Sequence, residues 1–162
     1  MDNIELITGY LTNPEEIVEL CDRHRSKFTL RAEGEKYNFS TPYGNSNMKS
    51  MFYYDMPEEL RAAIFKTLPK QDLTADSYVI NRYDPGDFLP RHKDSQGAYW
   101  KFKLIFLQSD APHFAYYVND QMHLVNEVPG ALLKFPIDMD HEVTKIDDWE
   151  RPKYSLVLAW GK

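Results

Sequence analysis

Residues 102–125 read FKLIFLQSDAPHFAYYVNDQMHLV, and this stretch decides the fold. Its apolar and aromatic runs are short, as in β-strands, and they are separated by polar turn residues. Asn119-Asp120 lies between two of these runs and is typical of a tight hairpin turn. The stretch therefore predicts strands that follow one another closely in an antiparallel arrangement.

Similar runs fill the rest of the second half of the chain. They are SYVINRY (77–83), ALLKF (131–135) and YSLVLAW (154–160). Many short strands close together are typical of an antiparallel sandwich or jelly roll. We therefore expect a β-core over residues 77–160.

A helix is predicted near the N-terminus, over residues 13–28. Asn13 can cap it, Pro14 suits its first turn, and Glu16 completes a pattern like a capping box. Apolar residues then recur at helical spacing along the segment. All of these signals favour a helix that starts beside Pro14.

The remaining segments complete one predicted domain over residues 1–162. Residues 57–68 carry apolar residues on one helical face and are followed by Pro69, so they predict a second helix. Residues 31–51 are polar and predict a long loop or irregular hairpin, either a lid over a site or a plain connection. The expected fold class is mostly β, with a helical N-terminal part over residues 1–70.

Composition and charge exclude several classes of protein. The net charge is −6, and an acidic chain is repelled by phosphate backbones, so a nucleic-acid partner is disfavoured. The single cysteine, Cys21, excludes an internal disulfide and a cysteine-rich zinc site. The N-terminus lacks a signal-peptide pattern, and no segment approaches the roughly 20 apolar residues that span a bilayer. We therefore expect a cytoplasmic protein without a membrane partner.

Three residues have the types and spacing of ligands for a metal ion. His92 and Asp94 are two apart, and residues two apart in a strand project from the same face. His141 follows a later apolar run and can supply a third ligand from a distant part of the chain. Two histidines and one carboxylate form a facial triad, which suits non-haem Fe(II) and leaves coordination positions open.

A cationic segment follows the third candidate ligand. In a strand, Arg151, Lys153 and Ser155 would share one face. A cation beside a hydroxyl can bind the far carboxylate of an oxo-acid through charge-assisted hydrogen bonds. Both cations are candidate anchors, and we favour Lys153 because it directly precedes the final apolar run.

Six segments of the chain follow one another in a specific order. They are Tyr83 to Gly86, His92 to Asp94, Phe106-Leu107-Gln108, Pro129 to Phe135, His141 to Val143 and Lys153 to Trp160. In this order they resemble the 2-oxoglutarate/Fe(II) dioxygenase superfamily, most closely its prolyl 4-hydroxylase-like branch. The resemblance extends from about Ser77 to Trp160, which is roughly half of the chain.

The resemblance implies both a fold and a set of cofactors. The implied fold is a double-stranded β-helix, the jelly-roll or cupin-like barrel of that superfamily. The implied iron ligands are His92, Asp94 and His141. The resemblance implies 2-oxoglutarate as co-substrate, anchored by Lys153 with Ser155 assisting, and it places Tyr83 in the co-substrate pocket. It also implies O2, with ascorbate as a candidate reductant.

The implied activity is hydroxylation of a C–H bond with release of succinate and CO2. The expected substrate is a peptide, protein or amino-acid-like group, with a prolyl side chain as one candidate. Two positions depart from the pattern of the branch. Phe106 stands where a tyrosine often assists the anchor, and Tyr99-Trp100-Lys101 stands where prolyl hydroxylases often carry a substrate-contacting arginine.

Two other functions remain open from the sequence. One is a cupin-like metal-binding module without oxygenase activity, which would have no need for Lys153 and Ser155. The other is a nucleobase demethylase that uses the same iron chemistry. The acidic net charge and the lack of a basic, aromatic-interleaved stretch disfavour the demethylase.

Overall fold

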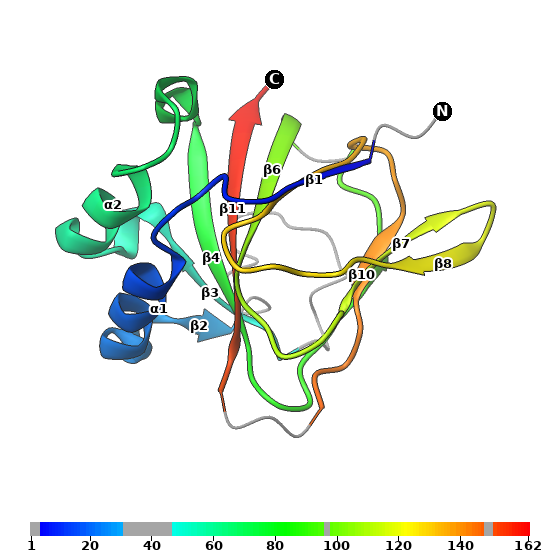
Figure 1. Cartoon of the computed structure of the whole chain (residues 1–162), viewed down its shortest axis with the longest axis horizontal. Helices are drawn as coiled ribbons and strands as arrows, with labels where there is room; N and C mark the ends of the chain where they lie inside the picture. The colour runs from blue at the N-terminus through cyan, green and yellow to red at the C-terminus, as the bar shows by residue number, and fades with distance from the viewer. Residues whose placement is uncertain (1–3, 31–46, 96–97, 148–150) are drawn as a thin grey trace.

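The computed structural model of the chain describes residues 4–30, 47–95, 98–147 and 151–162. Two antiparallel sheets face each other, and the helices lie on the outer side of the larger sheet (Figure 1). The expected fold class, mostly β with N-terminal helices and a double-stranded β-helix, is confirmed. None of the described helices is long and apolar enough to cross a membrane.

The larger sheet has the strand order β1-β9-β6-β11-β4-β3-β2. Its strands are β1 (Glu5–Ile7), β2 (Thr29–Leu30), β3 (Lys49–Phe52), β4 (Ser77–Tyr83), β6 (Tyr99–Gln108), β9 (Leu132–Lys134) and β11 (Lys153–Gly161). The C-terminal strand β11 pairs with β4 on one side and with β6 on the other, so it is enclosed along its length. The side chains of β11 alternate between the two faces of the sheet, and most of them are buried.

The smaller sheet has the strand order β5-β10-β7-β8. Its strands are β5 (Leu89–His92), β7 (Phe114–Val118), β8 (Gln121–Leu124) and β10 (His141–Val143). Asn119 and Asp120 connect β7 to β8 with φ of 52° and 62°. Asn and Asp tolerate this left-handed backbone better than most residues. The hairpin predicted at this turn is confirmed.

The helical segments lie before β4 in the chain and against the larger sheet. They are α1 (Pro14–Arg23), α2 (Glu58–Phe65) and the short 3-10 turns η1 (Arg25–Lys27), η3 (Tyr53–Asp55) and η4 (Lys70–Thr74). Helix α1 starts at the predicted residue, Pro14, and ends earlier than expected because the chain tightens into η1. Both predicted helices are therefore present, with shorter bounds.

The expected capping box at the start of α1 is wrong. The Asn13 side chain makes no capping hydrogen bond to the backbone of its own helix. Its amide nitrogen instead donates to Glu16 Oε1 and to the backbone oxygen of Ala63 in α2, each over 2.9 Å. Asn13 therefore ties the two helices together, because an acceptor on α2 lies within its reach.

Of the segment expected to form a loop or irregular hairpin, residues 31–51, the structure describes residues 47–51. Residues 31–46 lie outside the described residues. Residues 49–52 form β3, which pairs antiparallel with β2 and so agrees with the irregular hairpin, one of the two predicted alternatives. The strand forms because β4 offers a partner along its whole length, and the buried Ser50 hydroxyl donates to Asn81 Oδ1 over 2.8 Å.

Alternation along β11 divides the core in two. Leu156 and Leu158 face the helices and belong to the first cluster of buried apolar residues. Val157 faces the other way and packs against the second cluster, which includes Phe106 and Phe114. This second cluster fills the space between the two sheets, hereafter the sheet interior, and the candidate site lies beside it.

Candidate metal centre

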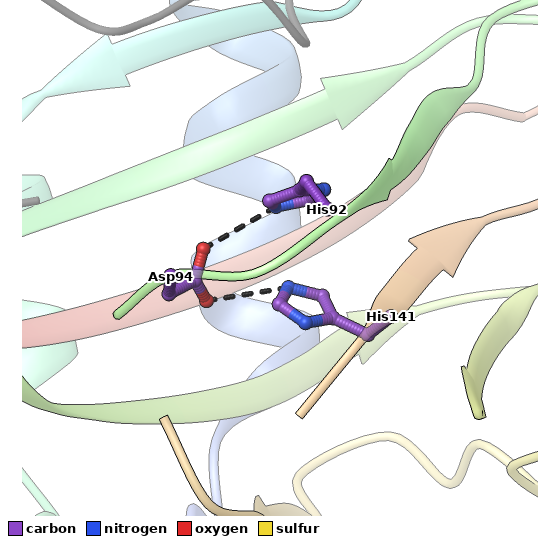
Figure 2. Close-up of side chains that lie close together, drawn as sticks. All are labelled: His92, Asp94 and His141. Carbon is purple, nitrogen blue, oxygen red and sulfur yellow. Dashed lines mark ion pairs between the residues drawn. The ribbon is translucent and has the colours of Figure 1, made fainter. Parts of the chain in front are cut away.

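Three side chains converge where the ends of two strands meet: His92, Asp94 and His141 (Figure 2). His92 is the last residue of β5, and His141 is the first residue of β10. The two histidines are direct partners in the antiparallel register, so strand pairing brings them together. Asp94 was expected on the same strand as His92, but it lies two residues beyond the end of that strand.

The ring nitrogens of both histidines face the carboxylate. His92 Nε2 lies 3.3 Å from Asp94 Oδ1, and His141 Nε2 lies 3.2 Å from Asp94 Oδ2. The two ring centroids are 4.3 Å apart. The three ligand atoms all lie within 4.8 Å of one another, which is close enough for a single ion to touch all three.

The other nitrogen of each ring is held by the backbone. His92 Nδ1 lies 2.6 Å from the carbonyl oxygen of Pro90, and His141 Nδ1 lies 2.9 Å from the carbonyl oxygen of Met139. A carbonyl oxygen only accepts, so Nδ1 carries the hydrogen in both rings. In a neutral ring with its hydrogen on Nδ1, Nε2 is the nitrogen that can ligate a metal, and both Nε2 atoms face Asp94.

The charges at the centre favour a bound cation. Burial raises the pKa of the Asp94 carboxyl, but the hydrogen bonds and charges of His141 and His92 outweigh it and hold that pKa well below its ordinary value. Burial lowers the pKa of His141, and the Asp94 carboxylate reverses the shift, so the net change is upward. The carboxylate is therefore ionised at neutral pH and attracts positive charge to the space between the rings.

Aromatic side chains hold His141 from the interior side. The Phe114 ring stacks on it with centroids 5.5 Å apart, and the Phe135 ring meets it edge-on at 5.1 Å. Phe106 lies behind Phe114, with their centroids 6.2 Å apart. These rings orient the imidazole and give the centre an apolar wall towards the sheet interior.

Lys153 is a buried cation in the sheet interior. It is the first residue of β11 and is only 1% exposed. Its Nζ lies 5.1 Å from the centre of the Phe106 ring and forms an ion pair with Glu127. Burial lowers the pKa of Lys153 to about 7, and the negative charge of Asp110 opposes that shift only in part. The charge of Lys153 therefore depends on having an anionic partner.

Two other predicted residues lie next to Lys153. Tyr83, 2% exposed, is its direct partner on β4. Ser155, 4% exposed, is two residues further along β11 and faces the same side of the sheet as Lys153. The structure thus places Lys153, Ser155 and Tyr83 together.

Arg151 lies elsewhere. The strand begins only at Lys153, so Arg151 lies outside it. Arg151 therefore does not share a face with Lys153 and Ser155, although the sequence predicted that it would. Its guanidinium donates to Gln108 Oε1. Arg151 also lines a groove of about 400 Å³ on the helix side of the larger sheet, together with residues of α1 such as Glu19. Pro152 separates the two cations and breaks the expected alternation.

The fold is similar to those of several solved structures. A prolyl-4-hydroxylase from Pseudomonas putida is 19% identical, with a TM-score of 0.63, and the match covers 100% of this chain and 94% of that one. The chain has the fold of the 2OG-Fe(II) oxygenases. An oxidoreductase of the 2OG-Fe(II) oxygenase family from Burkholderia pseudomallei is 13% identical, with a TM-score of 0.67 and coverage of 98% and 84%.

A third similar structure contains a peptide. It is a prolyl hydroxylase from Trichoplax adhaerens in complex with a peptide fragment of the hypoxia inducible factor oxygen degradation domain, 14% identical, with a TM-score of 0.68 and coverage of 99% and 84%. No family model and no curated protein sequence matches this chain. The likeness to 2OG-Fe(II) oxygenases is therefore one of fold.

The donor set fits Fe(II). Two imidazole nitrogens and one carboxylate on one side of an ion leave its other side open, as non-haem iron oxygenases require. Sequence reasoning singled out all three residues but missed Glu127, the partner of Lys153. Nothing in the local sequence distinguishes Glu127 from other carboxylates, since its role depends on a contact with a distant strand.

Proposed function

We propose that the chain is an Fe(II)- and 2-oxoglutarate-dependent oxygenase that hydroxylates a C–H bond. The observation that carries the proposal is the convergence of two Nε2 atoms and one carboxylate on a single point. A second observation supports it: the sheet interior behind this point holds a buried cation, Lys153. A metal-binding module without an oxo-acid co-substrate has no need for that cation.

Each residue then has a defined role. The metal would be held by His92, Asp94 and His141, with its remaining positions open. Lys153 would bind the distal carboxylate of 2-oxoglutarate by a charge-assisted hydrogen bond, and Ser155 would add a hydroxyl. Tyr83 would line the same pocket.

The bound iron, 2-oxoglutarate and O2 would together supply the oxidising power, with release of succinate and CO2, and ascorbate would keep the iron reduced. The chain itself would contribute orientation and exclusion of water. The rings of Phe106, Phe114 and Phe135 form an apolar wall beside His141. The backbone acceptors at Pro90 and Met139 keep both imidazoles in the metal-binding tautomer.

We place the substrate among peptides and amino-acid-like molecules. One structurally similar protein is a hydroxylase in complex with a peptide. In this chain β8 is the outer strand of the smaller sheet among the described residues, and each of its residues is exposed. An outer strand can pair with an extended peptide through its backbone. The net charge of −6 disfavours a nucleic-acid substrate.

Metal binding tests the first part of the proposal. The purified chain should bind one Fe(II), or Mn(II) as a stable substitute, by anaerobic titration calorimetry. A His92→Ala/His141→Ala double variant should lose this binding, because a single carboxylate remains. His123→Ala, which removes an exposed histidine of β8, is the control and should bind normally. Full metal binding by the double variant would contradict the assignment.

Turnover tests the second part. The metal-loaded chain should release succinate from 2-oxoglutarate, and a panel of peptides and amino acids should stimulate the release. Binding of metal without binding of 2-oxoglutarate would instead identify a metal-binding module. Stimulation by oligonucleotides alone would shift the substrate to nucleobases.

A further inference from the structure

The cation proposed to anchor 2-oxoglutarate already has an anionic partner within the chain. Lys153 Nζ is paired with Glu127 Oε1, and both side chains are only 1% exposed. Glu127 belongs to the segment between β8 and β9, whereas Lys153 begins β11. The pair is therefore a buried contact between two distant parts of the chain.

Glu127 is also held from its other side. Its Oε2 accepts hydrogen bonds from the backbone nitrogens of His113, over 2.5 Å, and Phe114, over 2.8 Å. These donors lie at the start of β7, in the smaller sheet. The carboxylate is thus fixed by two backbone groups through one oxygen, and its second oxygen is directed at Lys153.

Lys153 therefore has a paired counter-charge without any co-substrate. The Phe106 ring lies over the ammonium, Tyr83 and Ser155 lie beside it, and the charge of Asp110 also acts on it. The distal carboxylate of 2-oxoglutarate would bring a second anion to the same ammonium. Two carboxylates beside one cation in a buried space repel each other, because little water is present to screen them.

We propose that Glu127 competes with the distal carboxylate of 2-oxoglutarate for Lys153, and thereby sets the affinity and selectivity for the co-substrate. The inference rests on the proposed function. Binding of 2-oxoglutarate requires Glu127 Oε1 to leave Lys153 Nζ, while Oε2 can stay on the backbone nitrogens of His113 and Phe114. The exchange replaces one ion pair by another and breaks no covalent bond.

Competition of this kind has a specific consequence. The binding free energy gained when the distal carboxylate pairs with Lys153 is reduced by the loss of the Lys153–Glu127 ion pair. We therefore expect 2-oxoglutarate to be only weakly preferred over an oxo-acid that lacks a distal carboxylate. The suitable probe is 2-oxopentanoate, which has the same five carbons and the same metal-chelating end. The ratio of the two dissociation constants isolates the distal carboxylate from everything that happens at the metal.

The test uses the full chain loaded with Mn(II) and measures both oxo-acids by titration calorimetry. Glu127→Gln removes the charge and keeps an oxygen for the backbone nitrogens, so it frees Lys153. We expect 2-oxoglutarate to bind about tenfold more tightly or better in this variant, with 2-oxopentanoate nearly unchanged. Glu59→Gln, which neutralises an exposed carboxylate on α2, is the control and should leave both constants unchanged.

The outcomes separate competition from a purely structural role. A structural role would lower the melting temperature of Glu127→Gln without moving the ratio of the two constants. A ratio that rises by less than about tenfold in Glu127→Gln overturns the inference. Should that variant fail to fold, the wild-type ratio decides: a preference for 2-oxoglutarate of about tenfold or less supports competition, and a larger one overturns it.

Failure of the proposed function gives a different result. In that case the metal-loaded wild type binds neither oxo-acid, and the inference falls together with the function. If both oxo-acids bind and the ratio does not respond to Glu127→Gln, the oxygenase proposal stands and the inference alone is overturned.

Discussion

At the scale of single residues, the backbone beside each histidine determines which nitrogen is presented to a metal. The carbonyl oxygens of Pro90 and Met139 each accept a hydrogen bond from Nδ1 of the histidine two residues later. The same local arrangement therefore occurs twice, on two strands that are paired with each other. It turns both Nε2 atoms towards the Asp94 carboxylate, which explains why the three groups converge.

A prediction at this scale concerns Lys153. Lys153→Ala should weaken 2-oxoglutarate by about tenfold to a hundredfold, because a charge-assisted hydrogen bond contributes about 1.5–3 kcal/mol and each 1.4 kcal/mol is a factor of ten. Metal binding should survive, since Lys153 is not a ligand. Calorimetric titration of 2-oxoglutarate into the Mn(II)-loaded variant measures the effect, after a thermal melt has shown that the variant is folded.

Arg151→Ala is the matched control for Lys153→Ala. Arg151 lies in the groove beside α1 and contacts Gln108, away from the face of Lys153. We expect its removal to change the affinity for 2-oxoglutarate by less than about twofold. Loss of binding in Arg151→Ala with normal binding in Lys153→Ala would reassign the anchor to Arg151.

At the scale of elements, helices α1 and α2 are held to each other by polar contacts as well as by apolar packing. Asn13 receives a hydrogen bond from the hydroxyl of Thr67 over 2.9 Å and donates to the backbone oxygen of Ala63. These contacts connect the start of α1 to the end of α2 and to the residues just after it. Because both helices cover the outer face of the larger sheet, their relative position affects the packing of the first cluster of buried apolar residues.

Removal of the Asn13 hydrogen bonds should destabilise the fold without affecting the metal centre. We expect Asn13→Ala to lower the free energy of unfolding by about 1–2 kcal/mol, because it leaves part-buried partners without a hydrogen bond. Urea unfolding followed by tryptophan fluorescence measures it. Asn126→Ala, at an exposed position, should change stability by no more than about 0.5 kcal/mol. Equal effects of the two variants would show that the Asn13 hydrogen bonds contribute nothing to the free energy of unfolding.

At the scale of the whole molecule, a buried polar network connects the N-terminal segment, η4 and β6. Lys103 Nζ lies 2.6 Å from Asp72 Oδ1 and 2.9 Å from the Tyr10 hydroxyl, and that hydroxyl donates to Asp72 Oδ2 over 2.6 Å. Asp72 is completely buried. Burial lowers the pKa of Lys103, but its hydrogen bonds to Asp72 and Tyr10 outweigh it and raise that pKa. The ammonium is therefore charged and hydrogen-bonded to both groups.

Breaking this network should be costly. We expect Asp72→Asn to lower the free energy of unfolding by about 3–5 kcal/mol, because it leaves a buried ammonium without its counter-charge. A Lys103→Met/Asp72→Asn double variant should lose less than the sum of the two single variants, since the unpaired charge is gone. Urea unfolding of all four proteins measures the coupling. Strictly additive losses would show that the two groups do not interact.

Local signals in the sequence were sufficient for much of this structure. Helix starts depend on neighbouring residues, and Pro14 opens α1 as expected. A tight turn depends on the residues that tolerate left-handed backbone, and Asn119-Asp120 forms the predicted hairpin. The two-residue spacing of His92 and Asp94 is also a local property, and these residues do lie together.

Other features depended on contacts between distant segments, which no local pattern encodes. Strand β3 forms because β4 is available as its partner, although the polar stretch over residues 31–51 predicted only a long loop or irregular hairpin. Lys153 and Arg151 differ in position because β11 begins between them. Glu127 and Lys153 form an ion pair only when the two sheets are packed face to face. The attraction between two charges falls with distance, so it depends on the packing that brings these residues together.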